Sequence, residues 1–109
     1  MEFLEANLPD LPEGYYYPAE KEAAHLHAEL QRELPEGHLL FGVPVETFAA
    51  YEDNQDVLVC HTNQPERFTL IHLTWVGKTE ISAYYPSVTF DGNFAGFLEQ
   101  EQRFDAFDN

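Results

Sequence analysis

The side chains of this sequence that could do chemistry at neutral pH are few, and three of them lie in two apolar stretches. Cys60 and His61 end the stretch DVLVCH, and His72 lies in the middle of FTLIHLTW. A thiolate beside an imidazole can act as a nucleophile, and both groups are zinc ligands. However, neighbouring residues of a strand point to opposite faces, so His61 cannot face Cys60.

Known motif spacings are missing as well. The sequence has no CxxC, HxxxH or HExxH, no GxSxG, no glycine-rich phosphate loop and no dinucleotide-binding fingerprint. Twenty acidic residues make chance carboxylate pairs inevitable, so no pair can be singled out for acid–base catalysis. We therefore predict no catalytic residue, no metal site and no cofactor, and we expect Cys60 to be a buried, inert thiol.

The position of His72 depends on how the two apolar stretches pair. Both have the β-branched and aromatic content of strands, and the turn-like sequence NQPE separates them. We predict a hairpin in which Thr62 pairs with Arg67. This register places Val57 opposite His72, and it puts His61 on the face of His72 but about 13 Å away, too far to share a metal ion. The favoured interpretation is a His72 that is hydrogen-bonded within the core.

Further elements complete an α+β fold. Apolar residues at steps of three and four predict a helix over residues 19–34, with His25 and Glu29 pairing on its wet face. VETFAAYE predicts a strand before the hairpin, and TEIS a short strand after it. A second helix is expected over 94–107, capped by Asn93. The prediction is an N-terminal helix, an antiparallel meander of three to five strands and a C-terminal helix.

The length of 109 residues suits one domain, which we place at residues 18–109. Residues 1–17 are expected to form an irregular arm that packs on this domain through leucines and tyrosines: Leu4, Leu8, Leu11 and Tyr15 to Tyr17. The sequence shows no secretory signal and no apolar run of the roughly 20 residues that a membrane span needs, so we expect a cytoplasmic protein.

The net charge of −15 comes from 20 acidic and five basic residues. Such a chain should be repelled by nucleic acid and by anionic membranes, so neither is an expected partner. The charge could serve solubility alone, or it could attract a basic protein partner. The spread of the acidic residues along the whole chain favours solubility.

Several stretches of residues 26–100 resemble a family of small bacterial proteins whose activity is uncharacterised. The family pattern has a leucine-rich helix, a GHxLxG linker, DDVLF, VHLTWxGKxE, WPxT and an aromatic C-terminal helix. The most specific match here is His72, Leu73, Thr74, Trp75, Gly77, Lys78 and Glu80. Tyr85 replaces the tryptophan before the proline, QDVLVC replaces DDVLF, and the threonine after the proline is displaced. The resemblance implies an α–β–β–β–α body and no particular activity.

These observations favour a small, acidic, non-enzymatic module that binds a protein through its acidic surface and the tyrosine arm, in the manner of an inhibitor or immunity protein. The alternative is a small-ligand-binding protein or an enzyme with a site around His72. The candidate ligand-binding residues for that alternative are His72, Trp75, Lys78, Glu80 and Tyr85. Strand alternation argues against a single pocket, because it places His72 and Trp75 on opposite faces unless a bulge intervenes.

Overall fold

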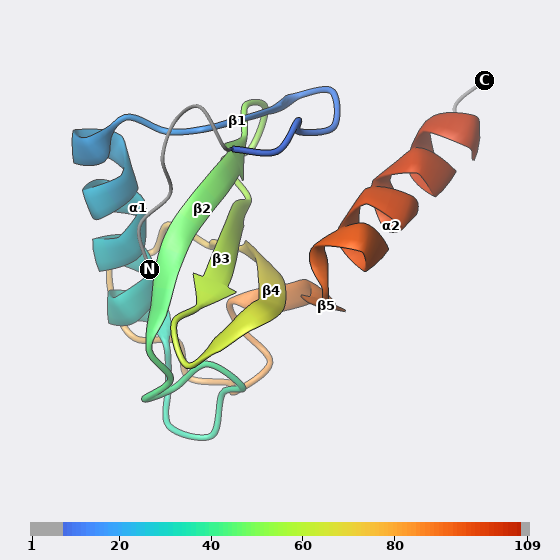
Figure 1. The fold of residues 1–109 in the computed structure, drawn as a ribbon. Coiled ribbons are helices and arrows are strands. Elements are labelled where there is room, and N and C mark those ends of the chain that lie inside the picture. Colours follow the sequence, from blue (N-terminus) through green and yellow to red (C-terminus); the bar gives the residue numbers. More distant parts are fainter. Residues whose placement is uncertain (1–7, 108–109) are drawn as a thin grey trace.

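The fold is an antiparallel meander with a helix before it and a helix after it (Figure 1). The computed structural model describes residues 8–107 and, from 103 onward, the backbone alone. The five strands are hydrogen-bonded in chain order, which confirms the predicted α+β class. The elements are β1 (Tyr15–Tyr16), α1 (Glu20–Glu33), β2 (Val45–Tyr51), β3 (Val57–His61), β4 (Gln64–His72), β5 (Ser87–Gly92) and α2 (Phe94–Phe107).

The two helices lie on opposite faces of the sheet, so the molecule has three layers (Figure 1). Leucines of α1 pack against one face, together with Val57 and Ile71. Phe97 of α2 packs against the other face, together with Leu58 and Leu70. The central strand β3 is buried along its whole length, which explains why its sequence is a continuous apolar run rather than an alternating one.

The N-terminal arm joins the second layer, as predicted. Leu8, Leu11, Tyr15 and Tyr17 pack against the cluster around Phe97, and β1 adds a short strand to the edge of the sheet beside β2. The predicted contact of Leu4 lies outside the described residues. Asn93 caps α2 as expected, since its Oδ1 accepts the Gly96 N–H at 2.7 Å.

The predicted register of the β3–β4 hairpin is wrong. His61 pairs with Gln64 across a tight turn, and after an irregularity in the register Cys60 pairs with Phe68. Pro65 follows Gln64 and has no N–H to donate to the neighbouring strand. The residues of β4 between Gln64 and Phe68 therefore form the irregularity in the pairing. Val57 therefore pairs with Ile71 instead of His72, and Val59 with Thr69 instead of Leu70, so these pairs move by one residue.

A shift of one residue exchanges the two faces of a strand. Cys60 lies in the cluster beside Phe68 instead of near Thr69, and it is a buried free thiol whose pKa is raised by burial, as expected for an inert cysteine. His61 faces the α1 side and is separated from His72 by the sheet. The predicted strand at TEIS is also wrong, because residues 73–86 form a loop.

Candidate functional site: an acidic cavity beside His72

The structure distributes the five candidate residues over three places. His72 is at the end of β4, where its side chain is 49% exposed, so the predicted core histidine is wrong. Trp75, Lys78 and Glu80 belong to the loop that follows, and this loop lies along α1. Tyr85 is exposed further along the same loop. The five residues therefore do not line one common pocket.

Two buried glutamates of α1 hold the loop that carries the HLTWxGKxE motif. Glu33 accepts the backbone N–H groups of Thr74 at 2.9 Å and of Trp75 at 2.8 Å, and Glu29 accepts that of Gly77 at 3.1 Å. Glu33 in turn offers its backbone carbonyl to the N–H of Glu80 at 3.0 Å. These contacts give the loop the backbone partners that a sheet would otherwise supply.

The two glutamates are electrostatically linked. Burial raises the pKa of the Glu33 carboxyl, whereas the hydrogen bond from Glu33 is the main reason why the pKa of Glu29 is lowered. Glu33 is thus the member of the pair that takes a proton first. Residues 74–77 are therefore held against α1 by the carboxylates of this pair.

Sequence reasoning missed this role for Glu29 and Glu33. The predicted pair of His25 and Glu29 on a wet face is wrong, since Glu29 is buried and bonds Arg32 at 2.6 Å. His25 instead stacks on the Trp75 ring, with 5.6 Å between the ring centroids. The available signal was the i, i+4 spacing of two acids beside the leucine stripe.

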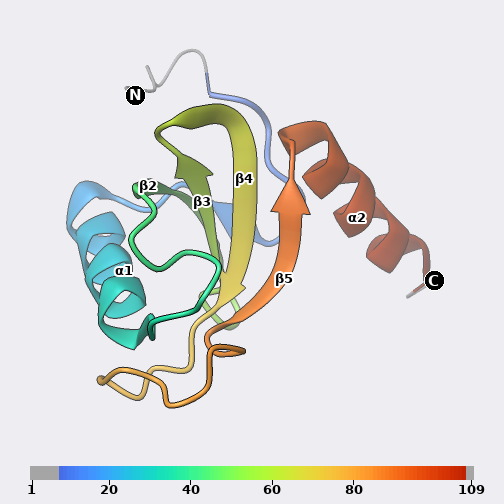
Figure 2. The ribbon, with the colours of Figure 1, turned by 90° about the horizontal axis from the view of Figure 1, so that it is seen from below.

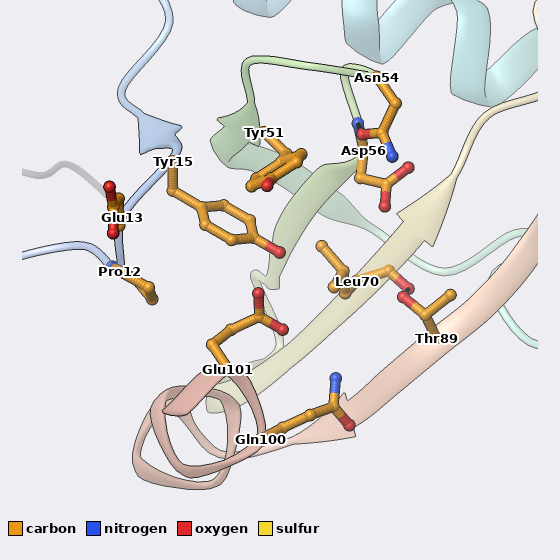
Figure 3. A pocket seen from close by; sticks show the side chains of 10 residues that line it. All are labelled: Pro12, Glu13, Tyr15, Tyr51, Asn54, Asp56, Leu70, Thr89, Gln100 and Glu101. Carbon is orange, nitrogen blue, oxygen red and sulfur yellow. Dashed lines mark hydrogen bonds between the residues drawn. The ribbon is translucent and has the colours of Figure 1, made fainter. Parts of the chain in front are cut away.

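A cavity of about 360 Å³ opens beside His72, between the N-terminal arm, the sheet and α2 (Figure 3). Its walls combine carboxylates, aromatic rings and polar groups from parts of the chain that are far apart in sequence. The lining residues are Pro12, Glu13, Tyr15, Tyr51, Asn54, Asp56, Leu70, Thr89, Gln100 and Glu101. None of the lining residues is a lysine or an arginine.

The cavity carries negative charge around an uncharged phenol. Figure 3 shows the Asp56 and Glu101 side chains on opposite sides of the cavity, with the Tyr15 hydroxyl between them. Burial raises the pKa of Tyr15, and the adjacent Glu101 carboxylate raises it further, so the hydroxyl keeps its proton at neutral pH. Tyr15 is fixed by its neighbours, since it packs on Tyr51 and edge-on against Phe97.

His72 is connected to this cavity through Asp56. Its Nδ1 lies 2.5 Å from Asp56 Oδ1. In the observed register Val57 pairs with Ile71, so the next residue of β4, His72, lies beside Asp56, which precedes Val57. This contact orients the imidazole, although His72 itself is not among the residues that line the cavity.

A separate surface forms where two loops meet at the C-terminal end of α1 (Figure 2). The buried His38 joins them: its Nδ1 accepts the Leu40 N–H at 3.0 Å, and its Nε2–H donates to the Pro86 carbonyl at 2.7 Å. Because Nδ1 is an acceptor, this histidine is neutral and structural. Gly37 lies against Ala83 at the same junction.

Large apolar side chains project from these joined loops into solvent. In the described part of the chain, every exposed large hydrophobic residue lies in the two loops or in the first residues of β5. Ile81 is fully exposed and Tyr84 is 85% exposed. We call the following set the loop patch: Leu39, Phe41, Ile81, Tyr84 and Tyr85.

Comparisons of this chain with protein-family models, with curated proteins and with solved structures find no match. Among the described residues, neither helix has the length and apolar character that crossing a bilayer requires. In the same part of the chain, no group of three histidine, cysteine or acidic side chains is arranged to hold a metal ion.

Proposed function

We propose that this protein is a small, cytoplasmic, non-enzymatic module that binds a basic protein through the loop patch. The observation that carries the proposal is the concentration of exposed apolar side chains on two loops that buried hydrogen bonds hold together. Apolar residues gathered in this way on an otherwise polar surface are typical of protein-binding sites.

Rigidity supports this role for the loop patch. The His38–Pro86 bond and the Glu33 contacts with Thr74 and Trp75 fix both loops on α1. A surface that is already ordered loses little conformational entropy when a partner binds. Ile81 and Tyr84 make few contacts within their own chain, so their apolar area is available to a partner.

Charge selects the kind of partner. A net charge of −15 repels acidic proteins and nucleic acid and accelerates encounters with basic surfaces. Glu36 and Glu80 adjoin the loop patch along the chain and would lie at the rim of such an interface. Masking of a basic target, as an inhibitor or immunity protein does, is one form of this function.

A capture experiment with matched variants tests the proposal. The immobilised protein should retain a basic protein at low salt, and retention should fall as NaCl rises, because exposed charges are screened. The double substitution Ile81→Ser and Tyr84→Ser should abolish retention, since burying each large apolar side chain is worth roughly 1.5–3 kcal/mol. The substitution Gln64→Ser, at an exposed position of β4 that is not part of the loop patch, is the control.

Two results would refute the proposed function. One is retention of proteins that are not basic or that remain bound at high salt. The other is equal retention by the loop-patch variant and by the Gln64→Ser control, provided that both variants show the same thermal unfolding as the wild type.

A further inference from the structure

We propose that the cavity beside His72 binds the primary ammonium group of a small organic amine. This site shares no residue with the loop patch and is independent of the proposed protein partner. The charge, the aromatic rings and the size of the cavity each limit the class of ligand that it can bind.

The first limit is charge. The side chains of Asp56 and Glu101 lie on opposite sides of the cavity (Figure 3). The neighbouring His72 donates Nδ1–H to Asp56, which orients the carboxylate without cancelling its charge while the imidazole is neutral. The residues that line the cavity contribute carboxylates and no lysine or arginine, so the cavity favours a cationic ligand over an anionic one.

The second limit distinguishes an organic cation from a metal ion. Calcium and magnesium need six or more oxygen ligands close to the ion. Here much of the wall is the rings of Tyr15 and Tyr51, whose centroids are 4.9 Å apart, and the apolar side chain of Leu70. Aromatic faces attract organic cations, and the apolar wall suits the methylene groups that such ligands carry.

The third limit is size and hydrogen bonding. A volume of about 360 Å³ is larger than a single ion requires and lies at the lower end of small-molecule sites. A primary ammonium has three N–H donors, which carboxylate oxygens of Asp56 or Glu101 can accept alongside their existing partners His72 and Tyr15. Quaternary ammonium groups lack these donors and could make no such hydrogen bond.

Calorimetric titration with putrescine tests the inference, and butane-1,4-diol, which has the same carbon chain without charge, is the matched ligand. At physiological ionic strength, putrescine should bind saturably with one molecule per chain, and the diol should not bind. Glu101→Gln and Asp56→Asn should each weaken putrescine binding at least tenfold. Glu36→Gln makes the same change in net charge on an exposed loop and should leave the affinity within twofold of the wild type.

The inference fails if putrescine shows no saturable binding. It also fails if Glu36→Gln weakens binding as much as Glu101→Gln does, because the whole acidic surface would then be responsible. Glu101→Gln leaves the His72–Asp56 contact intact, so it decides the question even if Asp56→Asn impairs folding. Neither failure bears on the loop patch, which the capture experiment tests separately.

Discussion

Glu33 shows at the scale of one residue how a charged side chain can organise a loop. Its carboxyl accepts two backbone N–H groups of the segment after β4 and also lies 3.0 Å from the Thr74 hydroxyl. Glu33→Ala would leave these donors without their partner in a partly buried place. We expect this substitution to lower the free energy of unfolding by about 2–3 kcal/mol.

Urea unfolding followed by the fluorescence of Trp75, the single tryptophan, measures the effect of Glu33→Ala. The matched substitution Glu36→Ala removes an exposed carboxylate from the loop after α1 and should change the stability by no more than about 0.5 kcal/mol. Equal effects of the two substitutions would contradict the structural role of Glu33.

His61 is one of two buried histidines in the described part of the chain. The Thr69 hydroxyl donates to Asp91 at 2.8 Å, so it must accept from the His61 Nε2–H, which lies at 2.7 Å, and this fixes the tautomer. Burial lowers the pKa of His61, and the charge of Arg67 lowers it further. The folded state therefore prefers the neutral imidazole.

This preference predicts a pH dependence of stability. Between the lowered pKa of folded His61 and the unfolded value of about 6.5, the unfolded chain binds more protons, so stability is lost as the pH falls through this interval. His61→Gln retains a donor for Thr69 and removes the titration. Between pH 7 and pH 5, the free energy of unfolding should fall less for the variant than for the wild type. An equal fall in both proteins would contradict the argument.

Among the elements, α2 matters most for the cavity because it supplies Glu101 while Phe97 anchors it to the sheet. Its first turn depends on Asn93, whose side chain accepts the Gly96 N–H. Asn93→Ala should lower the free energy of unfolding by about 1 kcal/mol, whereas Asn93→Ser should retain most of the stability, since serine is also a good cap. Thermal unfolding of both variants measures this, and indistinguishable losses would contradict the capping role.

Helices and strands could be predicted from the sequence where the spacing of apolar residues is regular. The register of the β3–β4 hairpin could not be predicted in this way. The leucine spacing of α1 and the β-branched runs of β3 and β4 gave the correct helix and strands. The hairpin turn differs from the predicted one, and the shift of one residue leaves His72 at the end of β4, half exposed and in contact with Asp56. The burial of Glu29 and Glu33 was also missed, because their spacing beside the leucine stripe does not reveal that a loop more than 40 residues away covers them.

The whole molecule presents two distinct surfaces on one acidic body. The cavity lies between the arm, the sheet and α2, and the loop patch lies where two loops meet at the end of α1. Long-range attraction from the net charge would bring basic partners to both, but only the loop patch offers exposed apolar area for a protein interface. This division predicts that a bound protein covers the loops and leaves the cavity accessible.

Hydrogen exchange of the protein in complex with its captured basic partner tests the central claim most directly. We predict slower amide exchange in residues 37–42 and 79–88 of the complex than of the free protein, with residues 94–102 unchanged. Slower exchange confined to residues 8–17 and 94–102, with the two loops unaffected, would contradict the assignment of the loop patch as the protein-binding surface.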